Sequence, residues 1–315
     1  MTFNTTDNLC FLDSLVQLVA CAFPTFDISA PSKSHKAGDE SAALKEFISV
    51  VDSVRAQSED VKIEHLGQLL SEICPGIEVG EHGDPSECWA MLISSMEEYI
   101  DMSCFELKEK SQSRCCSCDM RSNGGDDVVR GIICKLGGLT KRCTVDELLQ
   151  NELQGKTETL QDYYCRNPEC TNFLDRKKYK EEIKALQDKG NHDQEIEVLR
   201  SKAKDFQGER ITYLEGTPSM LLVELSRHLP SLSKSKRHVE LEVNRDYRIN
   251  DNTYSLVGIA RHYGTGLNSG HWTTVVKGVS GVWFEYEQTS KKEVAVGQVS
   301  SKEAVHLVFK KQESH

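Results

Sequence analysis

Two residues of the sequence have types that could act together as a nucleophile and a base, Cys10 and His271. Cys10 stands at the start of a segment with helical spacing, where unpaired amide groups and the helix dipole favour a thiolate. His271 follows Gly270 on a predicted strand and could accept the thiol proton. Each residue alone also fits a structural role, because free cysteines are often buried and inert.

Four further cysteines form two close pairs whose spacing suits a tetrahedral zinc site. The candidate ligands are Cys115, Cys118, Cys165 and Cys170. The first pair has two residues between its ligands, whereas four residues separate the cysteines of the second pair. Three other cysteines could replace a ligand: Cys116, Cys134 and Cys143. We expect structural Zn2+ here, because a small module with few core residues needs a cross-link.

The secondary structure predicted around these residues changes from helices in the first third of the chain to strands in the last third. Apolar residues at helical spacing predict helices over 12–19, 44–54 and 66–73, and Asp84-Pro85-Ser86-Glu87 offers the capping box of a fourth. The last third of the chain is rich in β-branched and aromatic residues and predicts strands. These strands are Met220–Leu225, Tyr254–Ile259, His271–Val276, Val282–Tyr286 and Ala304–Phe309. Between the two parts, the charged stretch 175–206 predicts a helical hairpin inserted into a cysteine-bearing module.

Composition narrows the range of partners and compartments. The 315 residues carry a net charge of -11, which disfavours nucleic acid as a partner and favours a basic peptide. No segment reaches the roughly 20 apolar residues of a membrane helix, and no secretory signal is present. Twelve cysteines without such a signal favour a reducing compartment, so we expect a cytoplasmic or nuclear protein with no membrane partner.

The chain resembles the ubiquitin-specific protease family in two ordered sequence boxes. The cysteine box matches at Asn8, Phe11, Leu12, Asp13, Ser14 and Gln17 around Cys10. The histidine box comprises Tyr254–Ile259, His262-Tyr263-Gly264, Gly270-His271-Trp272 and Trp283–Tyr286. The matching stretches run in family order from residue 4 to about residue 310. Each box alone is a weak pattern, and the resemblance rests on their joint occurrence.

The resemblance implies an α+β, papain-like fold that forms one catalytic domain over 1–315. Its parts would be a helical thumb over about 1–103, zinc-ribbon fingers over about 104–218 that contain the cysteine pairs, and a β-rich palm over about 219–315. It also implies a deubiquitinase, a thiol protease that cleaves after the C-terminal Gly-Gly of ubiquitin through an acyl-enzyme. In that mechanism Cys10 is the nucleophile and His271 the general base.

The sequence departs from the family at the third catalytic position and near the oxyanion site. The family has Asp or Asn where this chain has Glu287, which can still orient an imidazole; Gln288 is the substitute. Thr5 and Asp7 replace a usual Asn and Gly, so Asn8 and the Cys10 amide are the expected oxyanion donors. We therefore expect an active enzyme that is slow or selective.

The residues that would hold the tail of the substrate follow from the same resemblance. They are Asp84, Glu87, His262, Gly270 and Trp272, although the first two are also explained as a helix cap. Two alternatives to a deubiquitinase stay open: a protease for a ubiquitin-like modifier, and an inactive ubiquitin-binding pseudoenzyme. A zinc-ribbon scaffold is a weaker third, because it would leave the cysteine and histidine boxes unexplained.

Overall fold

The computed structural model describes 16 stretches of the chain, and its described residues fall into two compact units. The first unit contains Met1–Leu107, Val129–Gln150 and Gly216–His315, and the second Lys108–Val128 and Asn151–Glu215. The described residues are 9–22, 39–56, 63–73, 88–90, 102–136, 143–161, 163–190, 192–204, 206–226, 239–240, 246–249, 251–264, 270–278, 280–287, 290–298 and 303–312.

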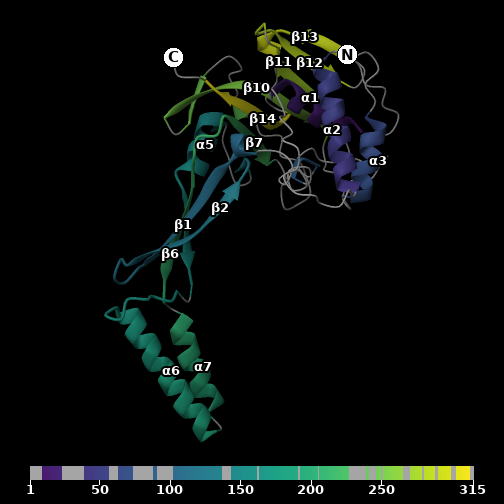
Figure 1. Cartoon of the computed structure of the whole chain (residues 1–315). Coiled ribbons are helices and arrows are strands. Elements are labelled where there is room, and N and C mark those ends of the chain that lie inside the picture. Colours follow the sequence, from purple (N-terminus) through teal and green to yellow (C-terminus); the bar gives the residue numbers. More distant parts are fainter. Residues whose placement is uncertain are drawn as a thin grey trace. The chain divides into compact units, whose positions relative to one another are not determined.

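The helices predicted in the first third of the chain are confirmed as α1 (Cys10–Ala22), α2 (Asp39–Arg55) and α3 (Glu64–Ile73). Residues 88–90 are also helical, as expected beyond the predicted cap, and a 3-10 turn follows at η1 (Ser103–Phe105). α1 packs against α2 and α2 against α3 (Figure 1). In the described part of the chain, no helix has both the length and the apolar character to cross a membrane.

The first unit also contains an eight-stranded sheet, in which all five predicted strands are found. Its order is β13-β12-β11-β10-β14-β7-β3, with β9 paired to β10. The bounds are β3 (Ile132–Lys135), β7 (Met220–Ser226), β9 (Asp246–Ile249), β10 (Asn252–Tyr263), β11 (His271–Lys277), β12 (Trp283–Glu287), β13 (Ser290–Val294) and β14 (Ala304–Lys311). Neighbouring strands are antiparallel except for β3, which runs parallel to β7.

Helix α1 packs on this sheet and contacts β11 most extensively (Figure 1). Its apolar residues are buried in one core with residues of α2, α3 and the sheet. The Thr274 hydroxyl of β11 donates a 3.0 Å hydrogen bond to the Ser14 carbonyl of α1, across a sequence separation of 260 residues. This contact places the first residue of α1 and the first residue of β11, Cys10 and His271, in the same region of the unit.

The second unit contains a four-stranded sheet in the order β2-β1-β6-β5 and the predicted helical hairpin. Its elements are β1 (Leu107–Cys115), β2 (Arg121–Val129), β5 (Lys156–Leu160), α6 (Thr171–Lys189), α7 (Asp193–Lys204) and β6 (Gly208–Glu215). The two helices pack against each other (Figure 1). The sequence did not predict these strands, because they are rich in polar residues and most of their positions are half-buried or exposed.

Residues 129–150 lie within the range expected for the fingers, but they group with the first unit. Strand β3 explains this difference, because Ile132 and Cys134 are buried where β3 pairs with β7. The remaining elements of this unit are β4 (Cys143–Thr144), α5 (Val145–Leu153), β8 (Val239–Glu240) and η2 (Val296–Gln298). β4 pairs in parallel with β8.

Adjacent isoleucines test the position of β3 in the larger sheet. Ile132 is 2% exposed and Ile133 is 54% exposed. Ile132→Ala removes buried methylene and methyl groups and should lower the free energy of unfolding by about 2–4 kcal/mol. Ile133→Ala, the matched control, should change it by less than about 1 kcal/mol. Denaturant unfolding measures both, and equal losses would contradict the assigned strand faces.

Candidate active site and metal centre

Cys10 is the first residue of α1 and is only 4% exposed. Burial raises the pKa of its thiol above the usual value, and the Asp13 carboxylate raises it further. Backbone amide groups of Trp272, Cys10 and Phe11 act in the opposite direction by hydrogen bonding to the sulfur. Because the raising effects win, the resting group at neutral pH is a thiol that must lose its proton to react.

His271 begins β11 and meets the predicted third residue at the end of the neighbouring strand. Its Nε2 atom lies 3.0 Å from Oε1 of Glu287, the last residue of β12. The contact has the distance of an ion pair, but its angle does not satisfy a hydrogen bond. Since Nε2 faces Glu287, the Nδ1 atom is the ring nitrogen left to accept a proton.

The segment before His271 approaches a neighbouring histidine very closely. A Cβ atom added at Gly270 would lie 2.1 Å from Nε2 of His262 and 2.6 Å from the carbonyl oxygen of Tyr263. The His262 ring lies against Trp272, with 4.6 Å between ring centroids, and both side chains are buried. Glycine is therefore required at position 270.

A partly buried ion pair connects the strands that carry these residues. The Arg261 guanidinium of β10 donates to the Glu285 carboxylate of β12 and to the Thr273 hydroxyl of β11. Glu285 precedes Glu287 by two residues, so the two side chains lie on the same face of β12. This network fixes the end of β12 relative to β11. Glu285 lies within the histidine box, but the sequence gave no signal for Arg261.

The four predicted zinc ligands lie together in the second unit. Their sulfur atoms are all within 4.8 Å of one another, with Cys115 and Cys170 3.7 Å apart and Cys118 and Cys165 3.6 Å apart. A tetrahedral site with Zn–S bonds of about 2.3 Å requires sulfur atoms about 3.8 Å apart. These four residues therefore fit a tetrahedral metal ion. Of the possible replacements, Cys116 is exposed, and Cys134 and Cys143 belong to the other unit.

Local turns explain how the widened second cysteine pair still converges on one point. The Asn167 carbonyl accepts a hydrogen bond from the Cys170 amide, and the Asn167 side chain accepts one from the Glu169 amide. The Asn167 amide itself donates to the Cys165 sulfur. This turn accommodates the two residues by which the spacing of Cys165 and Cys170 exceeds that of the first pair. In the first pair, the Met120 amide lowers the pKa of the Cys118 thiol to about 7, whereas burial raises the pKa of the Cys165 thiol to about 12 and also raises that of Cys170. Of these three thiols, Cys118 most readily forms the thiolate that a metal binds.

Several predicted site residues lie outside the described part of the chain. They are the oxyanion donor Asn8, the tail-binding residues Asp84 and Glu87, and Gln288. Their assigned roles stay predictions. Among the described residues, the structure brings Glu287 to His271 and the four cysteines to one another.

Comparison with known proteins gives one family and one group of solved structures. The family model of ubiquitin carboxyl-terminal hydrolase matches residues 2–309. The SAGA DUB module of Ubp8, Sgf11, Sus1 and Sgf73 bound to monoubiquitin matches with 17% identity and a TM-score of 0.70, over 100% of this chain and 69% of that chain. The module bound to ubiquitin aldehyde has 16% identity and a TM-score of 0.68, over 100% and 70%.

A yeast SAGA DUB module with mutant Sgf73 gives 17% identity and a TM-score of 0.67, over 100% of this chain and 69% of that chain. No curated protein sequence matches. At these identities the solved structures establish a common fold, and this fold is the one expected from the sequence. Since the family model covers nearly all residues, the chain belongs to the ubiquitin carboxyl-terminal hydrolase family, which confirms its resemblance to the ubiquitin-specific proteases.

Proposed function

We propose that this cysteine deubiquitinase uses Cys10, His271 and Glu287 to hydrolyse the bond that follows the C-terminal Gly-Gly of ubiquitin. The observation that carries the assignment is the contact between His271 Nε2 and Glu287 beside the Cys10 end of α1. With Cys10 as nucleophile and His271 as base, this contact supplies the orienting carboxylate of a catalytic triad. The third residue is longer by one methylene than the family's Asp, and it still reaches the imidazole.

The first step of the proposed mechanism moves the Cys10 proton. Since burial raises the pKa of the thiol, few molecules hold a free thiolate at neutral pH. His271 accepts this proton at Nδ1, and the Glu287 carboxylate stabilises the resulting imidazolium through Nε2. The backbone amide groups of Trp272, Cys10 and Phe11 then stabilise the sulfur anion. Proton transfer therefore creates the thiolate nucleophile at a buried position.

The later steps form and hydrolyse a thioester. The Cys10 sulfur attacks the carbonyl carbon of the last ubiquitin glycine, and the imidazolium returns its proton to the leaving amine as the C–N bond breaks. Water then attacks the thioester with His271 again acting as base, which releases the ubiquitin carboxylate and restores the thiol. We propose Asn8 and the Cys10 amide as donors to the transient oxyanion.

Ubiquitin is the substrate that the comparisons support. The solved SAGA DUB modules of the same fold are bound to monoubiquitin and to ubiquitin aldehyde. We propose Asp84 and Glu87 as the carboxylates that bind the arginines of its tail, with Gly270 beside the scissile end. The close approach of Gly270 to Tyr263 and His262 supports a narrow passage there.

We propose that Zn2+ is bound by Cys115, Cys118, Cys165 and Cys170 as a structural ion. The support is the fit of four sulfur atoms to tetrahedral spacing. Among the described residues, the hydrophobic cluster around these cysteines adds Tyr163 and Phe173, so apolar packing alone contributes little. When bound, the ion cross-links the loop after β1 to the segment before α6.

Intact mass after incubation with ubiquitin that carries a C-terminal thiol-reactive group tests the nucleophile and the substrate together. The wild-type chain should gain one ubiquitin mass through Cys10. Cys10→Ala should form no adduct, whereas Cys104→Ala, which removes another cysteine of the same unit, should react like the wild type.

Probes built on ubiquitin-like modifiers run beside it separate the alternatives. An adduct with one of these modifiers but none with ubiquitin would contradict the proposed substrate. No adduct with any probe would favour the inactive ubiquitin-binding protein.

Replacement of Glu287 tests its orienting role. Glu287→Ala should lower kcat for a ubiquitin reporter by at least about tenfold with little change in KM, because orienting carboxylates of this kind contribute up to about 10,000-fold. Glu287→Asp should recover part of the loss. Glu293→Ala, an exposed change on the adjacent β13, is the control and should keep full activity. Equal kcat in both alanine variants would move the orienting role to Gln288.

Metal analysis tests the cysteine centre. Freshly purified protein should contain about one equivalent of zinc, and Cys170→Ser should lose most of it because three thiolates remain. Cys116→Ser is the matched control, since Cys116 lies within the first pair but is exposed and outside the cluster. Less than about half an equivalent of zinc in the wild type would refute the assignment.

A further inference from the structure

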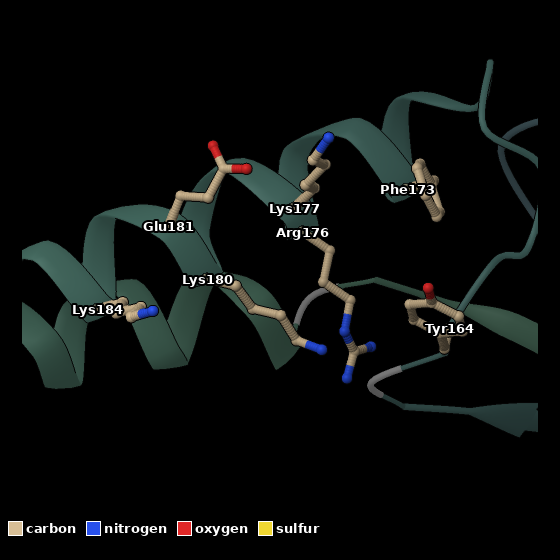
Figure 2. Close-up of a pocket in the computed structure, with 7 residues that line it drawn as sticks. All are labelled: Tyr164, Phe173, Arg176, Lys177, Lys180, Glu181 and Lys184. Atoms are coloured by element: carbon tan, nitrogen blue, oxygen red, sulfur yellow. The ribbon is translucent and has the colours of Figure 1, made fainter.

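The second unit contains a pocket that the active site and the cysteine centre do not use. It has a volume of about 380 Å3, and Figure 2 shows the side chains that line it. These residues, which we call the α6 pocket, are Tyr164, Phe173, Arg176, Lys177, Lys180, Glu181 and Lys184. Such a volume falls within the range of known ligand pockets.

The α6 pocket combines an aromatic wall with concentrated positive charge. The Arg176 guanidinium lies 5.3 Å and the Lys180 ammonium 5.7 Å from the centre of the Tyr164 ring. Figure 2 shows both cations extending toward this ring, while the Glu181 carboxylate points away from it. Four cations and one carboxylate line the pocket, in a chain whose net charge is -11. The pocket is therefore a local exception to the acidic character of the chain.

The lysines of the pocket are available to an external anion. A salt bridge on α6 joins Lys178 to Glu182, and neither residue lines the pocket. Within the part of the chain that the structure describes, Lys177, Lys180 and Lys184 have no carboxylate within ion-pair distance. Tyr164 is 49% exposed, so its ring is accessible together with these ammonium groups.

The lining residues form one stripe along α6. Phe173, Arg176, Lys177, Lys180 and Lys184 follow the spacing of three and four residues that places side chains on one face of a helix. From the first to the last, this stripe spans about 16 Å at 1.5 Å per residue. An extended peptide covers that distance with about five residues at 3.3 Å each. The stripe therefore matches a short peptide better than a single small anion.

The cysteine centre supports the aromatic end of this pocket. Phe173 packs against the cluster of Cys115, Cys165 and Cys170, and its ring centroid lies 6.1 Å from that of Tyr164. Tyr164 directly precedes Cys165 in the chain. The position of the aromatic pair is thus fixed by residues of the centre, and the cations of α6 are held against it.

We propose that the α6 pocket binds an acidic peptide segment of a partner protein, with an apolar side chain against Tyr164 and Phe173. Carboxylates of an extended segment would meet the cations along the helix, and a side chain between them would lie on the aromatic wall. A nucleic acid is disfavoured, because its long charged backbone meets the net negative field of the whole chain. The pocket belongs to a different unit from the catalytic residues, and its peptide binding does not depend on the proposed hydrolysis.

Fluorescence anisotropy with a defined peptide tests this proposal. The probe is a fluorescein-labelled Asp-Glu-Phe-Glu-Asp peptide, and its amide counterpart is Asn-Gln-Phe-Gln-Asn. The acidic probe should bind the full chain with saturation below about 1 mM and more weakly as salt rises. The double variant Arg176→Glu/Lys180→Glu should weaken binding at least about tenfold. Tyr164→Ala should also weaken it, which tests the apolar contact separately from charge.

The double variant Arg200→Glu/Lys202→Glu is the matched control, because it makes the same charge change at exposed positions of α7. It should bind the peptide like the wild type. Equal losses in both double variants would overturn the proposal, since they would reveal only a general charge effect. Equal binding of the amide peptide, absence of binding below about 1 mM, or tighter binding of a single-stranded oligothymidylate would overturn it as well. Zinc content and hydrolysis of a ubiquitin reporter, measured on every variant, verify that each is folded.

Discussion

The packing of α1 on β11 is the contact on which the catalytic site depends, because it joins the two ends of the chain. The buried hydrogen bond from Thr274 to the Ser14 carbonyl crosses this interface. A bond of this kind contributes only about 1 kcal/mol net, but leaving either polar group unpaired would cost about 1–3 kcal/mol. The apolar face of α1 supplies most of the attraction, and the hydrogen bond fixes the position along the strand. The Trp272 amide, two residues away, then reaches the Cys10 sulfur.

The same packing makes the Cys10 thiol harder to deprotonate. Burying Cys10 excludes water and raises the pKa of its thiol, so the site is less reactive at rest than an exposed thiolate. The amide groups around the sulfur offset this effect only in part. In the proposed mechanism, reactivity therefore depends on His271, whose Nε2 atom faces the half-exposed Glu287 carboxylate. The base that accepts the proton would then come from the palm sheet, and the sulfur from α1.

The sequence predicted the parts of the fold whose apolar residues form either a periodic pattern or a continuous run. Buried positions recur periodically in α2, α3 and β7, whereas α1, β11 and β14 are buried along most of their described length, and the proposed catalytic pair lies in two ordered boxes. Strand β2 could not be predicted, because Arg121–Val129 contains two glycines and two aspartates and is mostly exposed. β3 was missed because four residues are too few for a pattern, and its place in the sheet depends on pairing with the distant β7. Glu287 was uncertain for a further reason: only the geometry of β11 and β12 shows which carboxylate reaches the imidazole.

The second unit illustrates how a module holds its structure with little apolar packing. Helix α6 has no buried residue, and the hydrophobic cluster at its start consists mainly of cysteines. In the proposed zinc centre, a cross-link through those sulfur atoms replaces a core, and the side chains that pack on the cysteines are positioned by it. Phe173 is one of these, and Tyr164 lies beside it, so the aromatic wall of the α6 pocket is ordered by the same four residues. Loss of the metal ion should for this reason weaken acidic-peptide binding without any change in the charge of α6.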